Sequence, residues 1–167
     1  MTTRVNTYEN GKVVHIGSTG DAVGSAVAKL VAELSHDAIA KSGRFTVALS
    51  GGSLPKVHGR RIIGSTFHHP PIRFSKRACH VLLNESALWV ASISDSPKPP
   101  PKRITLTYPV VNNAAAVAFV ATGESKAPLM RHMLGVEVQT PPLPAARVLP
   151  TAGQVHWFID EAAAAKL

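Results

Sequence analysis

A glycine-rich loop with two serines is the first feature of this 167-residue sequence whose residues could bind a ligand. Ser50, Gly51, Gly52 and Ser53 follow the apolar run FTVAL, which is typical of a buried parallel strand. Glycines let the backbone approach a ligand closely, and successive N–H groups before a helix attract a phosphate. The Walker pattern and the dinucleotide pattern Gly-x-Gly-x-x-Gly are both absent, and an ordinary strand-to-helix turn is the alternative.

Two cationic residues occupy comparable places later in the chain. Arg103 begins the alternating run RITLTY after a proline-rich loop, and an arginine there could hold a phosphate through two hydrogen bonds. Lys126 follows the apolar run VAFVA and a turn that contains Gly123, where it could act as a point charge. A surface arginine and a lysine at a helix start are the alternatives. Because loops after parallel strands meet at one edge of a sheet, we expect Ser50–Ser53, Arg103 and Lys126 to converge on one anion site.

The eight histidines and the single cysteine form no catalytic or metal-binding pattern. His68 and His69 are adjacent, and with His58 and His80 they lack the spacing of metal ligands, so we predict loop positions for them. Cys79 alone allows neither an intrachain disulfide nor a cysteine metal cluster. A Gly-x-Ser-x-Gly nucleophile elbow is also absent. The spacing therefore assigns no metal ligand and no catalytic residue.

The net charge of +8 and the isoelectric point near 10.1 raise the question of a polyanionic partner. Lys and Arg are scattered singly or in pairs, and the densest group is Arg73, Lys76 and Arg77. The five Phe and two Tyr are not interleaved with basic residues, as a base-stacking surface requires. We therefore expect a basic surface with an anion pocket, and no nucleic-acid partner.

The sequence does not predict a membrane or secreted protein. Its N-terminus lacks the apolar core of a signal peptide, and none of its apolar runs is long enough to span a bilayer. Ala165-Lys166-Leu167 resembles the Ser-Lys-Leu peroxisomal address, with Ala in place of Ser. The end of an alanine-rich helix is the alternative reading of these three residues.

Strands that alternate with helices predict a single α/β domain over residues 1–167, with a three-layer, Rossmann-like parallel sheet flanked by helices. The predicted strands are 12–16, 45–49, 91–93, 103–108 and 117–121, and 145–148 and 154–158 are predicted to complete the sheet. The predicted helices are 22–40 with Asp21 as its cap, a helix within 82–90, 126–134, and 161–167 with Asp160 as its cap. Residues 59–79 show no clear period and are interpreted as an atypical junction.

Five segments resemble the 6-phosphogluconolactonase family, within the glucosamine/galactosamine-6-phosphate isomerase superfamily, and they occur in the family's order. They are SGGSLP (50–55), ISDSPKPPPKRITLT (93–107), VAFVATGESKA (117–127), PLPAARV (142–148) and WFIDEAAA (157–164). The resemblance implies a cytoplasmic enzyme of the pentose phosphate pathway that hydrolyses 6-phosphoglucono-1,5-lactone to 6-phosphogluconate without metal or organic cofactor. It places Ser50, Gly51, Gly52 and Ser53 on the phosphate loop, with Arg103 and Lys126 at positions that grip the phosphate.

Two motifs of that family are absent from this sequence. They are an Asp-Glu-Arg motif and the motif Gly-x-Gly-x-Asp-Gly-His-Thr-Ala-Ser-Leu-Phe-Pro, whose histidine is the family's expected general base. His80 resembles the region just after the second motif, so the fold is expected to be incomplete relative to the family. A positioned base is worth about 10²–10⁴-fold in rate. A non-catalytic protein that binds a phosphosugar or a partner is therefore the alternative function, and nucleic-acid binding ranks last.

Overall fold

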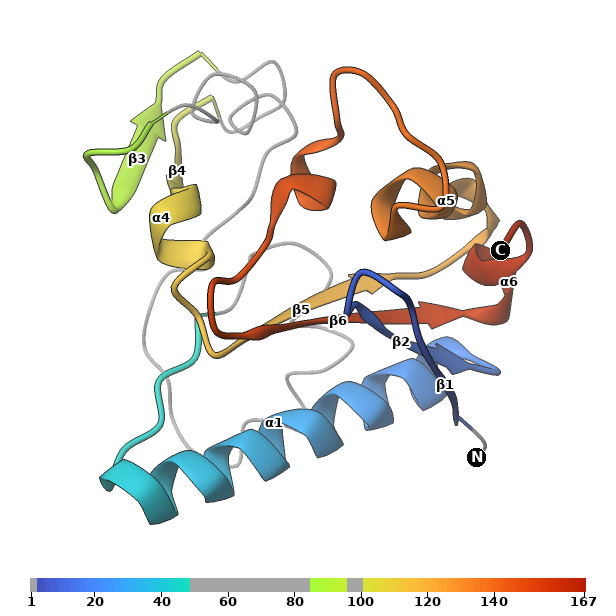
Figure 1. Cartoon of the computed structure of the whole chain (residues 1–167), viewed down its shortest axis with the longest axis horizontal. Helices are drawn as coiled ribbons and strands as arrows, with labels where there is room; N and C mark the ends of the chain where they lie inside the picture. The colour runs from blue at the N-terminus through green and yellow to red at the C-terminus, as the bar shows by residue number, and fades with distance from the viewer. Residues whose placement is uncertain (1–2, 49–84, 96–100) are drawn as a thin grey trace.

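The computed structural model describes residues 3–48, 85–95 and 101–167 (Figure 1). The strands are β1 Thr3–Thr7, β2 Val13–Gly17, β3 Val90–Ile93, β4 Arg103–Leu106, β5 Ala116–Ala121 and β6 Gln154–Asp160. The α-helices are α1 Gly20–Ser42, α4 Tyr108–Val111, α5 Ala127–Leu134 and α6 Glu161–Ala164, and the 3₁₀ helices are η1 Glu124–Lys126 and η2 Pro144–Arg147. The predicted junction 59–79 and the glycine-rich loop lie outside the described residues.

Four strands form the main sheet in the order β1-β2-β6-β5. β2 and β5 both pair in parallel with β6, whereas β1 is antiparallel to β2. β6 is an interior strand because β2 and β5 pair with its two edges, and its residues 155–159 are buried. The register places Gly17 opposite Asp160 and Ala121 opposite Ile159, so the three parallel strands end at the same edge.

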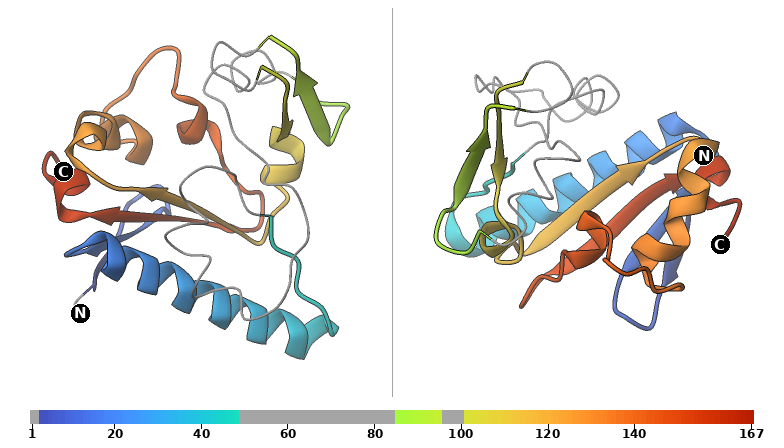
Figure 2. Two further views of the ribbon diagram at one scale, coloured as in Figure 1. Left: turned by 180° about the vertical axis from the view of Figure 1, so that it is seen from behind. Right: turned by 90° about the horizontal axis from the view of Figure 1, so that it is seen from above.

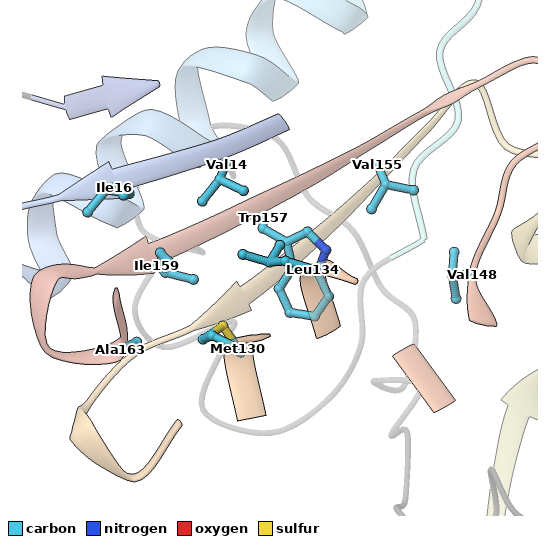
Figure 3. Packing of buried hydrophobic residues seen from close by; sticks show 9 residues of the cluster. All are labelled: Val14, Ile16, Met130, Leu134, Val148, Val155, Trp157, Ile159 and Ala163. Atoms are coloured by element: carbon cyan, nitrogen blue, oxygen red, sulfur yellow. The ribbon is translucent and has the colours of Figure 1, made fainter. Parts of the chain in front are cut away.

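Helices cover both faces of the sheet (Figures 1 and 2). On one face, Val14, Trp157 and Ile159 belong to a cluster with Met130 and Leu134 of α5, which Figure 3 shows together. On the other face, Phe158 packs against Val23 and Val27 of α1. This arrangement confirms the predicted three-layer α/β fold.

Helix α1 begins and ends at residues that suit its termini. The hydroxyl of Thr19 accepts a hydrogen bond from the N–H of Ala22 at 3.2 Å, so Thr19 is the N-cap, and Asp21 lies in the first turn instead of capping it. Gly43 ends the helix with φ of 71°, a conformation that glycine adopts without strain. The predicted cap was therefore wrong by two residues, because Thr19 takes the extended conformation that a cap needs.

Several predicted elements differ in the structure. Residues 45–48 are not in a strand, because they pair with none of the described strands and Thr46 and Ala48 are exposed; position 49 lies outside the described residues. Residues 85–89 are not helical, because the Glu85 carboxylate accepts the N–H groups of Ala87 and Leu88 and forms a turn. Tyr108 begins α4 instead of extending β4. Pro144–Arg147 forms the 3₁₀ helix η2 where the sheet was predicted to continue over 145–148, because the prolines before it favour a turn. Strand β1 was not predicted.

Strands β3 and β4 form a separate antiparallel hairpin, which lies beyond the amino-terminal end of β5 (Figures 1 and 2). The Thr107 hydroxyl donates a hydrogen bond to the carbonyl of Leu88 at 2.7 Å and closes the hairpin's open end. Large apolar residues on this hairpin and the turn before it are exposed: Leu88, Trp89, Val90 and Ile104. None of the described helices is long and apolar enough to cross a membrane.

Candidate functional site

The carboxyl-terminal edge of the parallel strands is the candidate site. β2, β6 and β5 end there together, and each is followed by a turn into a helix: α1, α6, and η1 with α5. In Figure 1 the start of α1, the whole of α6 and the start of α5 lie at this one end of the sheet. Open α/β folds bind their ligands at this edge, because the loops that follow parallel strands converge there.

The turn between β5 and η1 is fixed by a carboxylate from the neighbouring strand. Both oxygens of Asp160 accept the N–H of Gly123 at 3.0 Å, and Oδ1 also accepts the N–H of Ala163 at 2.8 Å. The carbonyl of Gly123 in turn accepts the N–H of Lys126 at 3.0 Å. One side chain of β6 thus connects the start of α6 to the turn that leads to Lys126.

Lys126 presents its side chain to solvent at the end of η1, immediately before α5. Its Nζ lies 3.4 Å from the hydroxyl of Ser125, and none of the ion pairs among the described residues includes it. An exposed ammonium group without a carboxylate partner can bind an anionic ligand at little desolvation cost.

The structure does not bring Arg103 and Lys126 together. Arg103 begins β4 in the hairpin, whereas Lys126 follows the opposite end of β5 (Figures 1 and 2). The chain leaves β4 through α4 and enters β5 at its amino-terminal end, and six strand residues at about 3.3 Å each separate the two ends by about 20 Å. Ser50, Gly51, Gly52 and Ser53 lie outside the described residues.

A histidine pair that sequence reasoning missed lies away from this edge. His15 Nε2 and His156 Nδ1 are 3.2 Å apart, and the ring of His15 stacks on Phe158 with centroids 4.3 Å apart. Burial lowers the pKa of both imidazoles, and for His15 the charge of His156 lowers it further while Glu33 opposes the shift. His15 lies on β2 and His156 on β6, which pair in parallel. The two residues are far apart in the sequence, so only the register of these strands could have revealed the pair.

The histidine pair has the features of a packing contact. Its rings lie on the face of the sheet that packs against α1, because they share that face with Phe158. Nowhere in residues 3–48, 85–95 and 101–167 do three His, Cys, Asp or Glu side chains gather as a metal site would require. The candidate site is therefore the edge that Lys126 and Asp160 share.

A family model provides the deciding comparison. The model described as "Glucosamine-6-phosphate isomerases/6-phosphogluconolactonase" matches residues 74–157, half of the chain. The chain belongs to this family. The matched range includes both Arg103 and Lys126.

Relatives named "6-phosphogluconolactonase" from Bos taurus and Homo sapiens are each 56% identical to the chain over 85 residues, which cover 51% of this chain and 33% of theirs. A "Probable 6-phosphogluconolactonase 1" from Oryza sativa is 49% identical over 82 residues. The chain therefore spans about a third of the length of the curated relatives that it matches.

Two solved structures share the fold. One is described as "6-phosphogluconolactonase from Trypanosoma cruzi", with a TM-score of 0.68 and 14% identity over 98% of this chain and 99% of that chain. The other is described as "Crystal Structure of devB protein", with a TM-score of 0.64 and 17% identity over 92% of this chain and 98% of that chain. These structures thus support the fold, whereas the family assignment rests on the sequence comparison.

Proposed function

We propose that the chain is a 6-phosphogluconolactonase, which hydrolyses 6-phosphoglucono-1,5-lactone to 6-phosphogluconate in the oxidative pentose phosphate pathway. The observation that carries the proposal is the 56% identity over 85 residues to two proteins of that name. The exposed cation Lys126, at the sheet edge where α/β folds bind ligands, is consistent with a phosphorylated substrate.

In this proposal the phosphate of the substrate is held at the carboxyl-terminal edge. Lys126 supplies a point charge there, and the loop Ser50, Gly51, Gly52 and Ser53 supplies hydroxyl and backbone N–H donors. Arg103 is the third predicted contact, and it would reach the same phosphate only from the hairpin at the other end of β5. Its substitution therefore separates a contact with substrate from a role within the hairpin.

The chemical step requires a water aimed at the lactone carbonyl and a base that takes its proton. The family motif that carries the expected histidine base is absent from the sequence. The oxygens of Asp160 already accept backbone N–H groups, and His15 and His156 pair with each other on the α1 face. These observations favour a second candidate function, in which the chain binds the phosphosugar without hydrolysing its lactone.

One experiment separates the candidates: lactone hydrolysis and 6-phosphogluconate binding are measured on the same preparation, with Lys126→Ala, Arg103→Ala and the control Lys29→Ala. A 6-phosphogluconolactonase accelerates hydrolysis over the spontaneous rate, and Lys126→Ala raises KM by about tenfold through loss of a charge-assisted contact. Lys29 is exposed on the outer side of α1 beside Glu33, so removing its side chain leaves both measurements unchanged.

Three other outcomes are informative. Binding that Lys126→Ala weakens, without hydrolysis above the spontaneous rate, supports the second candidate. Unchanged binding in Arg103→Ala removes that residue from the phosphate site. Absence of both activities, with tight salt-dependent DNA binding instead, contradicts both candidates.

We infer a cytoplasmic location, as expected for an enzyme of this pathway, with peroxisomal or glycosomal import through Ala165-Lys166-Leu167 as the alternative. The carbonyl of Lys166 accepts a hydrogen bond from Arg131 at 3.2 Å, so the tripeptide contacts α5. Imaging of an N-terminal fluorescent fusion with and without Leu167 distinguishes the two locations.

A further inference from the structure

We propose that Asp160 is a positioning residue for phosphosugar binding, because its carboxylate holds the turn that presents Lys126. This inference rests on the proposed function insofar as Lys126 contacts the phosphate. It assigns to Asp160 a task beyond capping α6, which is all that the sequence predicted for it.

The connection from Asp160 to Lys126 runs through two hydrogen-bonded steps. Both carboxylate oxygens accept the N–H of Gly123 at 3.0 Å, and the carbonyl of Gly123 accepts the N–H of Lys126 at 3.0 Å. The second bond closes the 3₁₀ turn that ends at Lys126. A change in the conformation of Gly123 therefore changes where η1 starts and where the Lys126 side chain begins.

Gly123 needs a contact from outside its own turn to hold its backbone conformation. Its φ of 90° and ψ of 150° belong to a region that side chains rarely allow, and a Cβ built there would meet nothing within 4 Å. Glycine visits many other conformations at little cost, so neither sterics nor local packing selects this one. The hydrogen bonds from its N–H to Asp160 supply the selection.

Asp160 is well placed to hold another segment, because it ends a rigid strand. Phe158 and Ile159, which precede it in β6, are fully buried between the two helical layers. Its Oδ1 also accepts the N–H of Ala163, whose side chain is buried in the core. The carboxylate is thus fixed by β6 on one side and by α6 on the other before it contacts Gly123.

Charge and position predict opposite effects for Asp160, and this makes the proposal testable. A carboxylate near an anion site weakens anion binding through Coulomb repulsion, so simple loss of the charge would tighten binding. Loss of the hydrogen bond to Gly123 lets the turn adopt other conformations, which weakens binding in proportion to the competent fraction. Asp160→Asn removes the charge and keeps Oδ1, whereas Asp160→Ala removes both.

The experiment titrates 6-phosphogluconate and inorganic phosphate into the full chain and its variants by calorimetry. Asp160→Ala is expected to raise Kd by about three- to tenfold, as a competent fraction of about 0.1–0.3 implies. Asp160→Asn is expected to bind as tightly as the parent chain or more tightly. Asp37→Ala is the control, since it removes an exposed carboxylate near the far end of α1, away from the candidate edge, and its Kd stays within about twofold.

Hydrogen exchange at the Gly123 amide gives a second measurement that does not depend on ligand. The amide is expected to exchange faster in Asp160→Ala, and at a rate between that of Asp160→Ala and the parent in Asp160→Asn, which keeps one of the two acceptor oxygens. An unchanged exchange rate in Asp160→Ala overturns the proposal even if that variant binds weakly. So does a variant Asp160→Ala that binds as tightly as the parent chain while Lys126→Ala binds weakly. If the parent chain binds neither probe, the proposed function fails, and the exchange result still decides whether Asp160 orders the turn.

Discussion

The four-stranded main sheet and the β3–β4 hairpin differ in how their strands are packed, although both contain runs that resemble the same family. The sheet buries strand β6 between two helical layers. Among the described residues the two strands of the hairpin pair only with each other, and Trp89 next to them is 77% exposed. Two-stranded ribbons are marginal in water unless another element covers one face. A strand-like run therefore determines a local shape, while its neighbours determine its stability.

The orientation of β4 illustrates the difference. Its alternating run predicts that the apolar residues face the core, yet Thr105 and Thr107 are buried and Ile104 is 46% exposed. The Thr107 hydroxyl donates to the carbonyl groups of Leu88 and Trp89, so hydrogen bonds within the hairpin favour this face. Because side chains alternate between faces, the choice inverts the burial of the whole strand.

The largest effect expected from this comparison is on global stability. Phe158→Ala removes a fully buried ring between β6 and α1, and we expect the free energy of unfolding to fall by about 3–5 kcal/mol. Trp89→Ala removes a larger ring from the hairpin region, where we expect a change within about 0.5 kcal/mol. Urea unfolding followed by circular dichroism measures both. Equal losses would show that the hairpin is integrated into the core and would end the distinction.

A smaller loss of stability is expected from a substitution at the contact between β2 and α1. At Gly17 a Cβ would lie 2.9 Å from the backbone nitrogen of Val23 and 3.2 Å from Ala22, so Gly17→Ala must displace α1 from β2. We expect a loss of about 1–3 kcal/mol. Gly20→Ala is the matched control three residues later, where a Cβ meets nothing within 4 Å and helix propensity favours alanine. Urea unfolding of the two variants measures the cost of the close approach, and a Gly17→Ala chain as stable as the control would contradict it.

The sequence predicted those elements whose local signals agree with their surroundings. β2, β5, β6 and α5 were found from apolar runs and glycine stops, and Asp160 was correctly predicted as the cap of α6. β1 was missed because its run TRVNT is polar and becomes a strand only by pairing with β2. At 45–48 the opposite occurred, since an apolar run predicted a strand, yet these residues pair with none of the described strands.

The candidate site was predictable only in part, for the same reason. Lys126 was found because a strand, a glycine and a helix follow one another along the chain. The hydrogen bonds that the Gly123 N–H donates to Asp160 join residues 37 positions apart, at the ends of neighbouring strands, so only the sheet order reveals them. The separation of Arg103 from Lys126 likewise depends on the connection through α4, which no local pattern encodes.

Acid is expected to affect the two regions in different pH windows. Burial lowers the pKa of His15 and His156 in the folded sheet, so the unfolded chain binds more protons below its ordinary imidazole pKa of about 6.5. The free energy of unfolding therefore falls as the pH drops below about 6.5 towards the lowered pKa values. Urea unfolding between pH 7.5 and 5 (roughly the range over which an unfolded imidazole titrates) measures the slope. The double variant His15→Gln/His156→Gln should flatten it.

The turn before the hairpin responds at lower pH and only locally. Hydrogen bonds from the N–H groups of Leu88 and Ala87 lower the pKa of the Glu85 carboxyl, so their stabilisation is present above about pH 4.3 and is lost as the pH falls through the lowered value. We expect amide exchange at Ala87 and Leu88 to accelerate in that window, and Glu85→Gln to remove the pH dependence. If those amides instead lose protection together with the sheet near pH 6, the hairpin and the sheet unfold as one unit. In that case the hairpin that carries the exposed Trp89 is as stable as the sheet, and it is not a weakly attached ribbon.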